Sequence, residues 1–219
     1  MPTVTSSAAV GEDGGMRIRP VGAHALLLDC DDPGQVQAWR AELWRRRDAG
    51  DLTATEIVPA AATVLVDGIP DPAATAARIA GWTPRDTGTG PGAAAEARVP
   101  TVYDGDDLPA VAGHWGMTVP AVVDLLTGTE FRVAFCGFAP GFGYLTGLPA
   151  ALAVPRLATP RTRVPAGSVA LAGPYAGIYP TASPGGWLLV GRTDLVLFDP
   201  YADPPARLTP GTRVRLVAR

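Results

Sequence analysis

Cysteine is nearly absent from this sequence. Its only two cysteines, Cys30 and Cys136, lie far apart, and neither belongs to a Cys-x-x-Cys pair. This usage excludes a disulfide framework and a thiolate zinc site. The sequence also lacks any run of about 18 apolar residues that would span a membrane, and its start has no basic segment ahead of an apolar core. We therefore expect a cytoplasmic protein that binds no membrane.

An excess of positive charge is also lacking. The formal net charge is −3, and charged residues make up 18% of the chain, which is below the usual quarter. A nucleic-acid partner is therefore not expected. Apolar residues account for 47% of the 219 residues, so the chain can bury one large core or two smaller ones.

Sequence motifs of known catalytic and nucleotide-binding sites are missing as well. The sequence contains no GxxxxGK(S/T) phosphate loop, no GxGxxG after a strand, no HExxH and no GxSxG. Its only histidines, His24 and His114, have no nucleophile at a motif spacing. The acidic cluster of Asp104, Asp106 and Asp107 is better explained by helix capping than by metal binding. No metal site is predicted, and the catalytic residues stay unknown.

The first half of the sequence predicts a tail followed by a small α+β domain. Residues 1–15 are small and polar, which is typical of a disordered tail. Strands are predicted at residues 16–19, 25–28, 56–59 and 63–67, with helices from Asp32 to near Gly50 and over residues 72–80. This ββαββα order over residues 16–83 favours antiparallel strands with helices on one face, in a ferredoxin-like α/β arrangement.

The second half predicts a β-barrel. Residues 84–100 lack periodicity and are rich in glycine, proline and alanine, so we expect a linker. Two short helices follow, at residues 106–113 and 118–126. Short apolar runs then predict strands at residues 131–136, 168–172, 187–190, 195–198 and 213–217. Their spacing indicates a closed or nearly closed barrel over residues 101–219, and an α+β fold for the whole chain.

A short arginine-bearing segment is the most suggestive for chemistry. It reads Thr159-Pro160-Arg161-Thr162-Arg163-Val164-Pro165. If the segment is extended, Arg161 and Arg163 project from the same face. Two guanidinium forks could then bind one carboxylate or phosphate, with Thr159 beside them. The alternative is a solvated basic edge strand.

Two glycine-rich blocks accompany this segment. The first, residues 137–144, places aromatic rings between Gly137, Gly141 and Gly143, where backbone amides could form an anion nest and Tyr144 could orient a substrate. The alternative is a barrel corner whose rings fill the core, and we favour it for Phe138 and Phe142 taken singly.

The second block, residues 179–187, carries hydroxyl groups at a turn. It contains Tyr179, Ser183, Gly185 and Gly186, and Ser183 is expected to hydrogen-bond rather than to attack. Arg192 follows the next short strand. It could add to the anion site or form a surface ion pair.

Taken together, these blocks resemble the allophanate hydrolase subunit 1 family, also called the KipI or 5-oxoprolinase B-subunit family. The family pattern GF.PGF.YL is matched at residues 137–145, PR..TPR..VPAGSV at 155–169, IYP..SPGGW at 178–187, and GRT at 191–193. Four blocks in order are far more specific than any one of them. The resemblance implies an N-terminal ferredoxin-like domain and a cyclophilin-like β-barrel.

The resemblance also implies a function that needs partners. In the 5-oxoprolinase branch, a C-type partner, which is of the allophanate hydrolase subunit 2 type, shares the site, and an A-type partner joins them. The complex couples ATP hydrolysis, with Mg²⁺ implied, to the opening of 5-oxoproline to glutamate, and this chain holds no tightly bound cofactor. Two alternatives stay open: a KipI-type inhibitor of a histidine kinase, and the carboxyltransferase component of a urea carboxylase or allophanate hydrolase system.

One departure from the family pattern concerns a histidine. Family members often show Leu-His-Ser/Thr before a barrel strand, whereas this chain reads Leu125-Leu126-Thr127. If that histidine takes part in chemistry, its replacement by Leu126 removes activity. If it packs or caps a helix, little changes.

Overall fold

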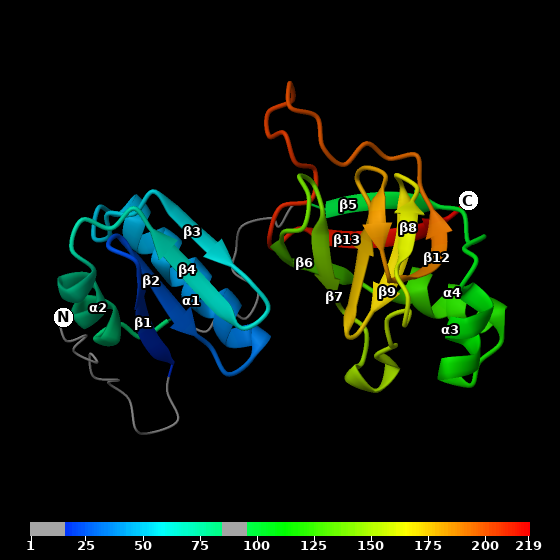
Figure 1. The fold of residues 1–219 in the computed structure, drawn as a ribbon, viewed down its shortest axis with the longest axis horizontal. Helices are drawn as coiled ribbons and strands as arrows, with labels where there is room; N and C mark the ends of the chain where they lie inside the picture. Colours follow the sequence, from blue (N-terminus) through cyan, green and yellow to red (C-terminus); the bar gives the residue numbers. More distant parts are fainter. Residues whose placement is uncertain (1–15, 85–95) are drawn as a thin grey trace, which may run out of the picture. The chain divides into compact units, whose positions relative to one another are not determined.

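The chain divides into two compact units, Met1–Pro91 and Gly92–Arg219. The computed structural model describes residues 16–84 and 96–219 (Figure 1). Each unit has a hydrophobic core of its own. The predicted tail over residues 1–15 and most of the predicted linker lie outside the described residues.

The first unit contains a four-stranded antiparallel sheet with the strand order β1-β2-β4-β3. Its elements are β1 (Arg17–Val21), β2 (Ala25–Asp29), α1 (Pro33–Asp48), β3 (Glu56–Pro59), β4 (Thr63–Asp67) and α2 (Pro72–Ala80). The predicted ββαββα order is therefore confirmed. Asp32 and Asp71 cap the two helices by accepting backbone N–H groups at 2.9 and 3.0 Å, and each is followed by a proline that suits the first helical turn.

One face of this sheet carries the core of the first unit. Strand side chains alternate in burial, because successive residues point to opposite faces of a sheet. Helix α1 packs on β3 and β4, and α2 packs on β1 and β2. The fully buried apolar residues from these strands and helices include Leu26, Leu28, Leu43, Val64, Val66 and Ile79.

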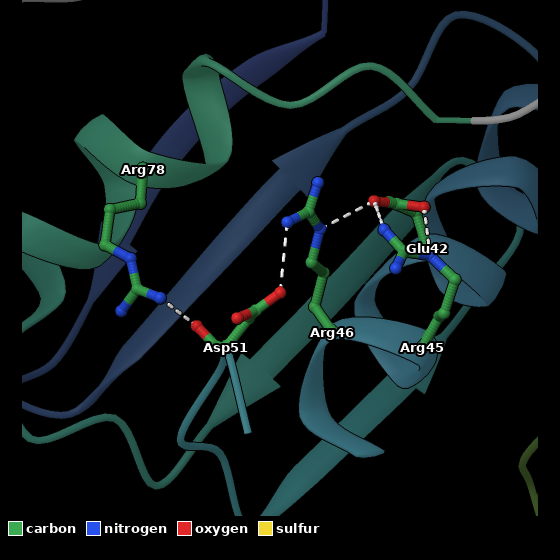
Figure 2. Close-up of polar contacts among 5 residues, drawn as sticks. All are labelled: Glu42, Arg45, Arg46, Asp51 and Arg78. Atoms are coloured by element: carbon green, nitrogen blue, oxygen red, sulfur yellow. Dashed lines mark hydrogen bonds and ion pairs between the residues drawn. The ribbon is translucent and has the colours of Figure 1, made fainter. Parts of the chain in front are cut away.

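A charged network joins the end of α1 to α2 (Figure 2). Glu42, which is 3% exposed, accepts from Arg45 at 2.5 Å and from Arg46 at 2.8 Å. Arg46 also donates to the Asp51 carboxylate at 3.1 Å, and Arg78 on α2 donates to the Asp51 backbone carbonyl. The hydrogen bond from Arg45 is the largest of several influences that lower the pKa of Glu42.

The second unit is built on a seven-stranded sheet with the order β12-β9-β10-β7-β6-β13-β5. Its strands are β5 (Glu96–Thr101), β6 (Phe131–Cys136), β7 (Gly143–Thr146), β9 (Ser168–Ala172), β10 (Tyr175–Ile178), β12 (Leu188–Arg192) and β13 (Arg213–Ala218). Val102, just after β5, and Arg192 exchange backbone hydrogen bonds of 2.9 and 2.8 Å. This bridge joins the two outer strands, so the predicted nearly closed barrel is confirmed.

Shorter elements surround the barrel. Helix α3 (Leu108–Trp115) packs on β12, and α4 (Val119–Gly128) packs on β13 (Figure 1). A 3₁₀ turn, η1 (Ala150–Leu152), follows β7, and β8 (Arg161–Val164) pairs with β11 (Ser183–Gly185) as a separate ribbon. Neither Cys30 nor Cys136 forms a disulfide within the described residues. Within residues 16–84 and 96–219, no helix has the length and apolar character needed to cross a bilayer.

Two predictions about the secondary structure of the second unit are wrong. The linker expected over residues 84–100 ends earlier, because β5 pairs in parallel with β13 and buries Val99 completely. The strand expected at residues 195–198 is absent, and only Phe198 forms a bridge, with Ala206. That segment belongs to the connection between β12 and β13, in which Leu197 is buried while Val196 is 63% exposed.

Candidate functional site

Arg161 of the predicted arginine segment is held by an acidic partner. Its Nη2 donates to Asp107 Oδ1 at 2.9 Å, and the Arg161 and Asp107 side chains are 26% and 12% exposed. The other oxygen of Asp107 accepts the backbone N–H of Leu189 at 2.7 Å. The hydrogen bond to Asp107 is the main cause that raises the pKa of Arg161.

Two buried polar atoms on the β8–β11 ribbon lack a hydrogen-bond partner among the residues that the structure describes. The second terminal nitrogen of Arg161, Nη1, is buried and forms no hydrogen bond with the described residues, and the same holds for Ser183 Oγ. Both residues lie on the β8–β11 ribbon. Because buried polar groups are nearly always paired, such atoms mark a place where a ligand or a partner can bind.

The remaining predicted residues of the arginine segment lie in solvent. Arg163 and Thr159 are exposed, and Arg163 forms no ion pair with any residue that the structure describes. Arg161 is therefore neutralised by Asp107, whereas Arg163 is not neutralised. Joint binding of one anion by the two arginines stays a prediction.

The glycine–aromatic blocks meet around a pocket of about 550 Å³. The predicted residues Tyr144, Tyr179 and Gly185 line it. It is otherwise lined by aromatic, proline and small residues and by one charged side chain: Phe138, Phe142, Val154, Pro155, Arg156, Ala172, Gly173, Pro174, Tyr175, Pro184 and Trp187. We call this hollow the aromatic pocket.

Phe142 organises the rings of the aromatic pocket. Its ring meets those of Phe138, Tyr144, Tyr179 and Trp187 edge-on, with centroids 5.1 to 5.5 Å apart. This geometry is the one that aromatic pairs prefer. Phe142 is 2% exposed, so the structural role favoured for it is confirmed.

Phe138 behaves differently from Phe142. Its side chain is 60% exposed, and its backbone is left-handed, with φ of 66°. The core-filling role favoured for it is therefore wrong. A bulky residue in this conformation is unusual and requires support from the surrounding turn.

Three of the five predicted glycines, Gly141, Gly143 and Gly185, lie where neighbouring atoms leave little room for a side chain. A Cβ at Gly185 would lie 2.3 Å from Tyr179 Oη, and one at Gly141, where φ is 83°, would lie 2.7 Å from Phe198 Cβ. Gly143 packs beside Val133, whereas Gly137 and Gly186 are less confined.

Three amides of the first glycine block form hydrogen bonds within the turn itself. The amide of Gly137 donates to the Phe142 carbonyl at 3.2 Å, and the amides of Ala139 and Phe142 bond to carbonyls of the same turn at 2.7 and 2.9 Å. These three donors are used inside the turn. These three amides are therefore unavailable to an anion, and a nest formed by the other amides of the block stays a prediction.

Arg192 forms the surface ion pair that was one of its two alternatives. Its Nε donates to Asp104 Oδ2 at 2.9 Å, and the two side chains are 58% and 47% exposed. Both residues line a smaller hollow of about 230 Å³ that also contains Asp106 and Ser168. Neither histidine lines this hollow or the aromatic pocket.

Sequence reasoning missed three residues of these sites. Arg156 and Tyr175 line the aromatic pocket, and Asp107 binds Arg161 rather than capping α3, where its side chain makes no cap hydrogen bond. Arg156 stands in the PR..TPR block, which was the available signal. Asp107 lies 54 residues from Arg161, so no local pattern could reveal their contact.

Leu126 occupies the position where family members often carry histidine. Its side chain on α4 is fully buried in the barrel core. In this chain the position therefore contributes to the packing of the barrel core.

Comparison with known proteins identifies the family. The family model described as carboxyltransferase domain, subdomain C and D, matches residues 16–208. The chain is similar to the B subunit of 5-oxoprolinase from Escherichia coli O157:H7, with 52% identity over 122 residues that cover 54% of this chain and 56% of that protein. The chain thus spans about half the length of the curated relatives it matches.

Solved structures extend the similarity to both units. Protein PH0987 from Pyrococcus horikoshii is 32% identical, with a TM-score of 0.54 over 92% of this chain and 97% of that one. The urea carboxylase of Kluyveromyces lactis is 18% identical, with a TM-score of 0.67 over 97% of this chain and 23% of that one, and shows the fold alone. From the matched span and these relatives, we conclude that the chain belongs to the carboxyltransferase domain, subdomain C and D family, within which it resembles the B subunit of 5-oxoprolinase.

Proposed function

We propose that this protein is the B-type component of an ATP-dependent 5-oxoprolinase, and that it works in the cytoplasm. The observation that carries the proposal is the 52% identity to the B subunit from Escherichia coli. In this reaction 5-oxoproline, ATP and water give glutamate, ADP and phosphate. ATP and its Mg²⁺ would be used together with the partner proteins, and no tightly bound cofactor is assigned to this chain.

We further propose ferredoxin-like and cyclophilin-like folds for the two units. The strand order β1-β2-β4-β3 in a ββαββα chain supports the first, because moving the last strand of a βαββαβ unit to its front produces this connectivity. The closure of the seven-stranded sheet through Val102 and Arg192 supports the second. A linker would join the two units.

The geometry supports a role in binding rather than bond-breaking. The aromatic pocket and the Arg161–Asp107 pair offer guanidinium groups and tyrosine hydroxyls, but no nucleophile hydrogen-bonded to a base among the described residues. The unpaired Nη1 of Arg161 could donate to a carboxylate or phosphate oxygen once a partner completes the site. This arrangement suits a site shared with the C-type partner, a protein of the allophanate hydrolase subunit 2 type, in a complex that also contains the A-type partner.

The proposal is tested by reconstituting the complex. The chain, its C-type partner and its A-type partner are purified and mixed, and phosphate release is measured with and without 5-oxoproline. We expect release that depends on 5-oxoproline and on all three proteins. A stable three-protein complex that releases no phosphate in response to 5-oxoproline would refute the function.

The two alternatives lack a comparable observation. Carboxyl transfer appears in the description of the family model, but the similarity to urea carboxylase is at 18% identity and concerns the fold alone, against 52% identity to a 5-oxoprolinase subunit. The kinase-inhibitor alternative rests only on the shared sequence blocks. Both are weaker than the 5-oxoprolinase proposal.

A further inference from the structure

The aromatic pocket carries a feature that packing does not explain. Phe138 has a left-handed backbone and 60% of its side chain is exposed, although both conditions are unfavourable for a large aromatic residue. Its ring lies edge-on to the buried rings of Phe142 and Tyr179, at 5.2 and 6.1 Å. The turn therefore holds an exposed ring at the edge of the pocket, where it can cover a ligand.

The charge of the aromatic pocket favours a negatively charged ligand. Among the described residues that line the pocket, Arg156 is the only charged one. The side chain of Arg156 is exposed and forms no ion pair with any described residue, yet it lies close enough to act on the buried hydroxyl of Tyr179. An unpaired guanidinium beside aromatic walls, with no carboxylate among the lining residues, favours an anion that accepts two parallel hydrogen bonds.

Tyrosine hydroxyls supply further polar contacts. Tyr144 and Tyr175 line the same pocket, and their rings are 5.7 Å apart and nearly perpendicular. Neither hydroxyl is hydrogen-bonded to a residue in the described ranges. A tyrosine hydroxyl has an ordinary pKa of about 10 and is therefore a donor at neutral pH, and burial raises the pKa of Tyr175 further. The two groups can hydrogen-bond a carbonyl or amide of the ligand.

We propose that the aromatic pocket binds a small organic carboxylate with a flat body, and that Arg156 anchors its carboxylate. Phe138 and the tyrosine rings would cover the body of the ligand, and the Tyr144 and Tyr175 hydroxyls would bind its remaining polar groups. The ligand 5-oxoproline, a carboxylate on a lactam ring, has these properties, and its identification as the ligand rests on the proposed function. The volume of about 550 Å³ also admits larger carboxylates.

Binding is measured by calorimetry on the full chain and on its complex with the partner proteins. The probes are 5-oxoproline, indole-2-carboxylate as a larger flat carboxylate, and 2-pyrrolidinone, which keeps the lactam ring but lacks the carboxylate. We expect a carboxylate to bind and 2-pyrrolidinone to bind at least about 10-fold more weakly. Arg156→Gln should weaken carboxylate binding by about 10- to 100-fold. Arg207→Gln, which changes an exposed arginine outside both hollows, should leave binding unchanged.

Phe138→Ala separates binding from folding. Because the Phe138 side chain is 60% exposed, its removal should leave the melting temperature unchanged. The loss of a covering ring should still weaken carboxylate binding by about 5- to 10-fold. If Phe138 served packing alone, Phe138→Ala would lower the melting temperature and leave the affinity for the carboxylate unchanged. That result would contradict the proposed role of this ring.

The outcomes separate this inference from the proposed function. Arg156-dependent binding of indole-2-carboxylate without binding of 5-oxoproline would support the pocket and contradict 5-oxoproline as its ligand. Normal 5-oxoproline-dependent phosphate release by an Arg156→Gln complex, with carboxylate affinity also unchanged, would overturn the pocket and leave the proposed function intact. The inference is likewise overturned if neither carboxylate binds the chain or its complex. The titration should extend to a carboxylate concentration of ~10 mM, at which even weak binding would be measured.

Discussion

At the scale of single residues, Asp107 connects three separate parts of the barrel unit. It lies at the start of α3, and its two oxygens bind Arg161 on β8 and the Leu189 amide on β12. A carboxylate that accepts both a guanidinium and a backbone amide orients the arginine as well as neutralising it. The availability of Arg161 Nη1 for a ligand therefore depends on Asp107.

Replacement of the Asp107 carboxylate should lower the stability of the protein. We expect Asp107→Ala to lower the free energy of unfolding by about 1–3 kcal/mol, because it leaves the Arg161 charge and the Leu189 amide without their acceptor. Urea denaturation measures the loss. The matched control is Asp106→Ala, which removes an exposed neighbouring carboxylate that accepts no hydrogen bond from the described residues and should cost less than about 0.5 kcal/mol. Equal losses would show that the Asp107 contacts contribute nothing specific.

Gly185 and Gly186 offer a second matched pair. A Cβ at Gly185 would lie 2.3 Å from the hydroxyl of the buried Tyr179, whereas at Gly186 the nearest atom is 3.5 Å away. We expect Gly185→Ala to cost about 1–3 kcal/mol of stability through overpacking, and Gly186→Ala to cost clearly less. Thermal unfolding of both variants tests this difference, and a larger loss for Gly186→Ala would contradict the packing.

Some of these residues could be predicted from the sequence and others could not. Tyr144, Tyr179 and Gly185 stand in blocks where rings alternate with glycine, a local pattern that signals a pocket. Arg156 stands in the PR..TPR block, so its segment was marked even though its place in the aromatic pocket was not predicted. Asp107 joins its site through a contact with Arg161, 54 residues away, for which a single sequence carries no local sign. The prediction for Phe138 is wrong because a positive φ at a phenylalanine follows from the shape of its turn, not from its residue type.

At the scale of secondary structure, the end of α1 depends on one buried carboxylate. Glu42 accepts hydrogen bonds from Arg45 and Arg46, and Arg46 continues to Asp51 (Figure 2). These contacts lower the pKa of Glu42 in the folded protein, with the bond from Arg45 contributing most. A carboxylate with a lowered pKa stabilises the folded state when it is ionised, above its unfolded pKa near ~4.3.

We therefore expect a pH-dependent effect of Glu42→Gln. At pH 7 the variant should be less stable by about 1–2 kcal/mol, a value reduced from that of a fully buried pair because both arginines are partly exposed. The difference should shrink below the ordinary pKa of a glutamate and vanish as the pH falls through the lowered folded pKa of Glu42. Urea denaturation between pH 7 and pH 3 measures it. Glu56→Gln, at an exposed strand position, serves as the control, and a pH-independent difference for Glu42→Gln would refute the charge argument.

The predictability of the elements follows the range of their contacts. Strands β3 and β4 and helix α2 have the predicted bounds, because alternation, an aspartate cap and proline mark them locally. The missed strands β5, β7, β10 and β11 are short and contain glycine or proline. Strands β7 and β10 pair with the preceding strand across a turn, and both are four residues long. Strand β5 instead pairs with β13 at the other end of the unit, and β11 pairs with β8. Such pairing depends on tertiary context rather than on local propensity.

At the scale of the whole molecule, the two units have separate cores. The cluster around Leu28 contains residues of the first unit only, and the cluster around Leu171 contains residues of the second only. A cavity in one core removes contacts within that cluster. The stability of each unit should therefore respond to its own core residues.

Two leucine variants test this independence in the full chain. Leu28 and Leu171 are both almost completely buried, so Leu28→Ala and Leu171→Ala should each cost about 2–5 kcal/mol in the unit that carries the change. Hydrogen exchange followed by mass spectrometry should show lost protection within residues 16–84 for Leu28→Ala and within residues 96–219 for Leu171→Ala. If either variant lowers protection in both ranges, the units unfold together, and the two cores would have to be treated as one cooperative structure.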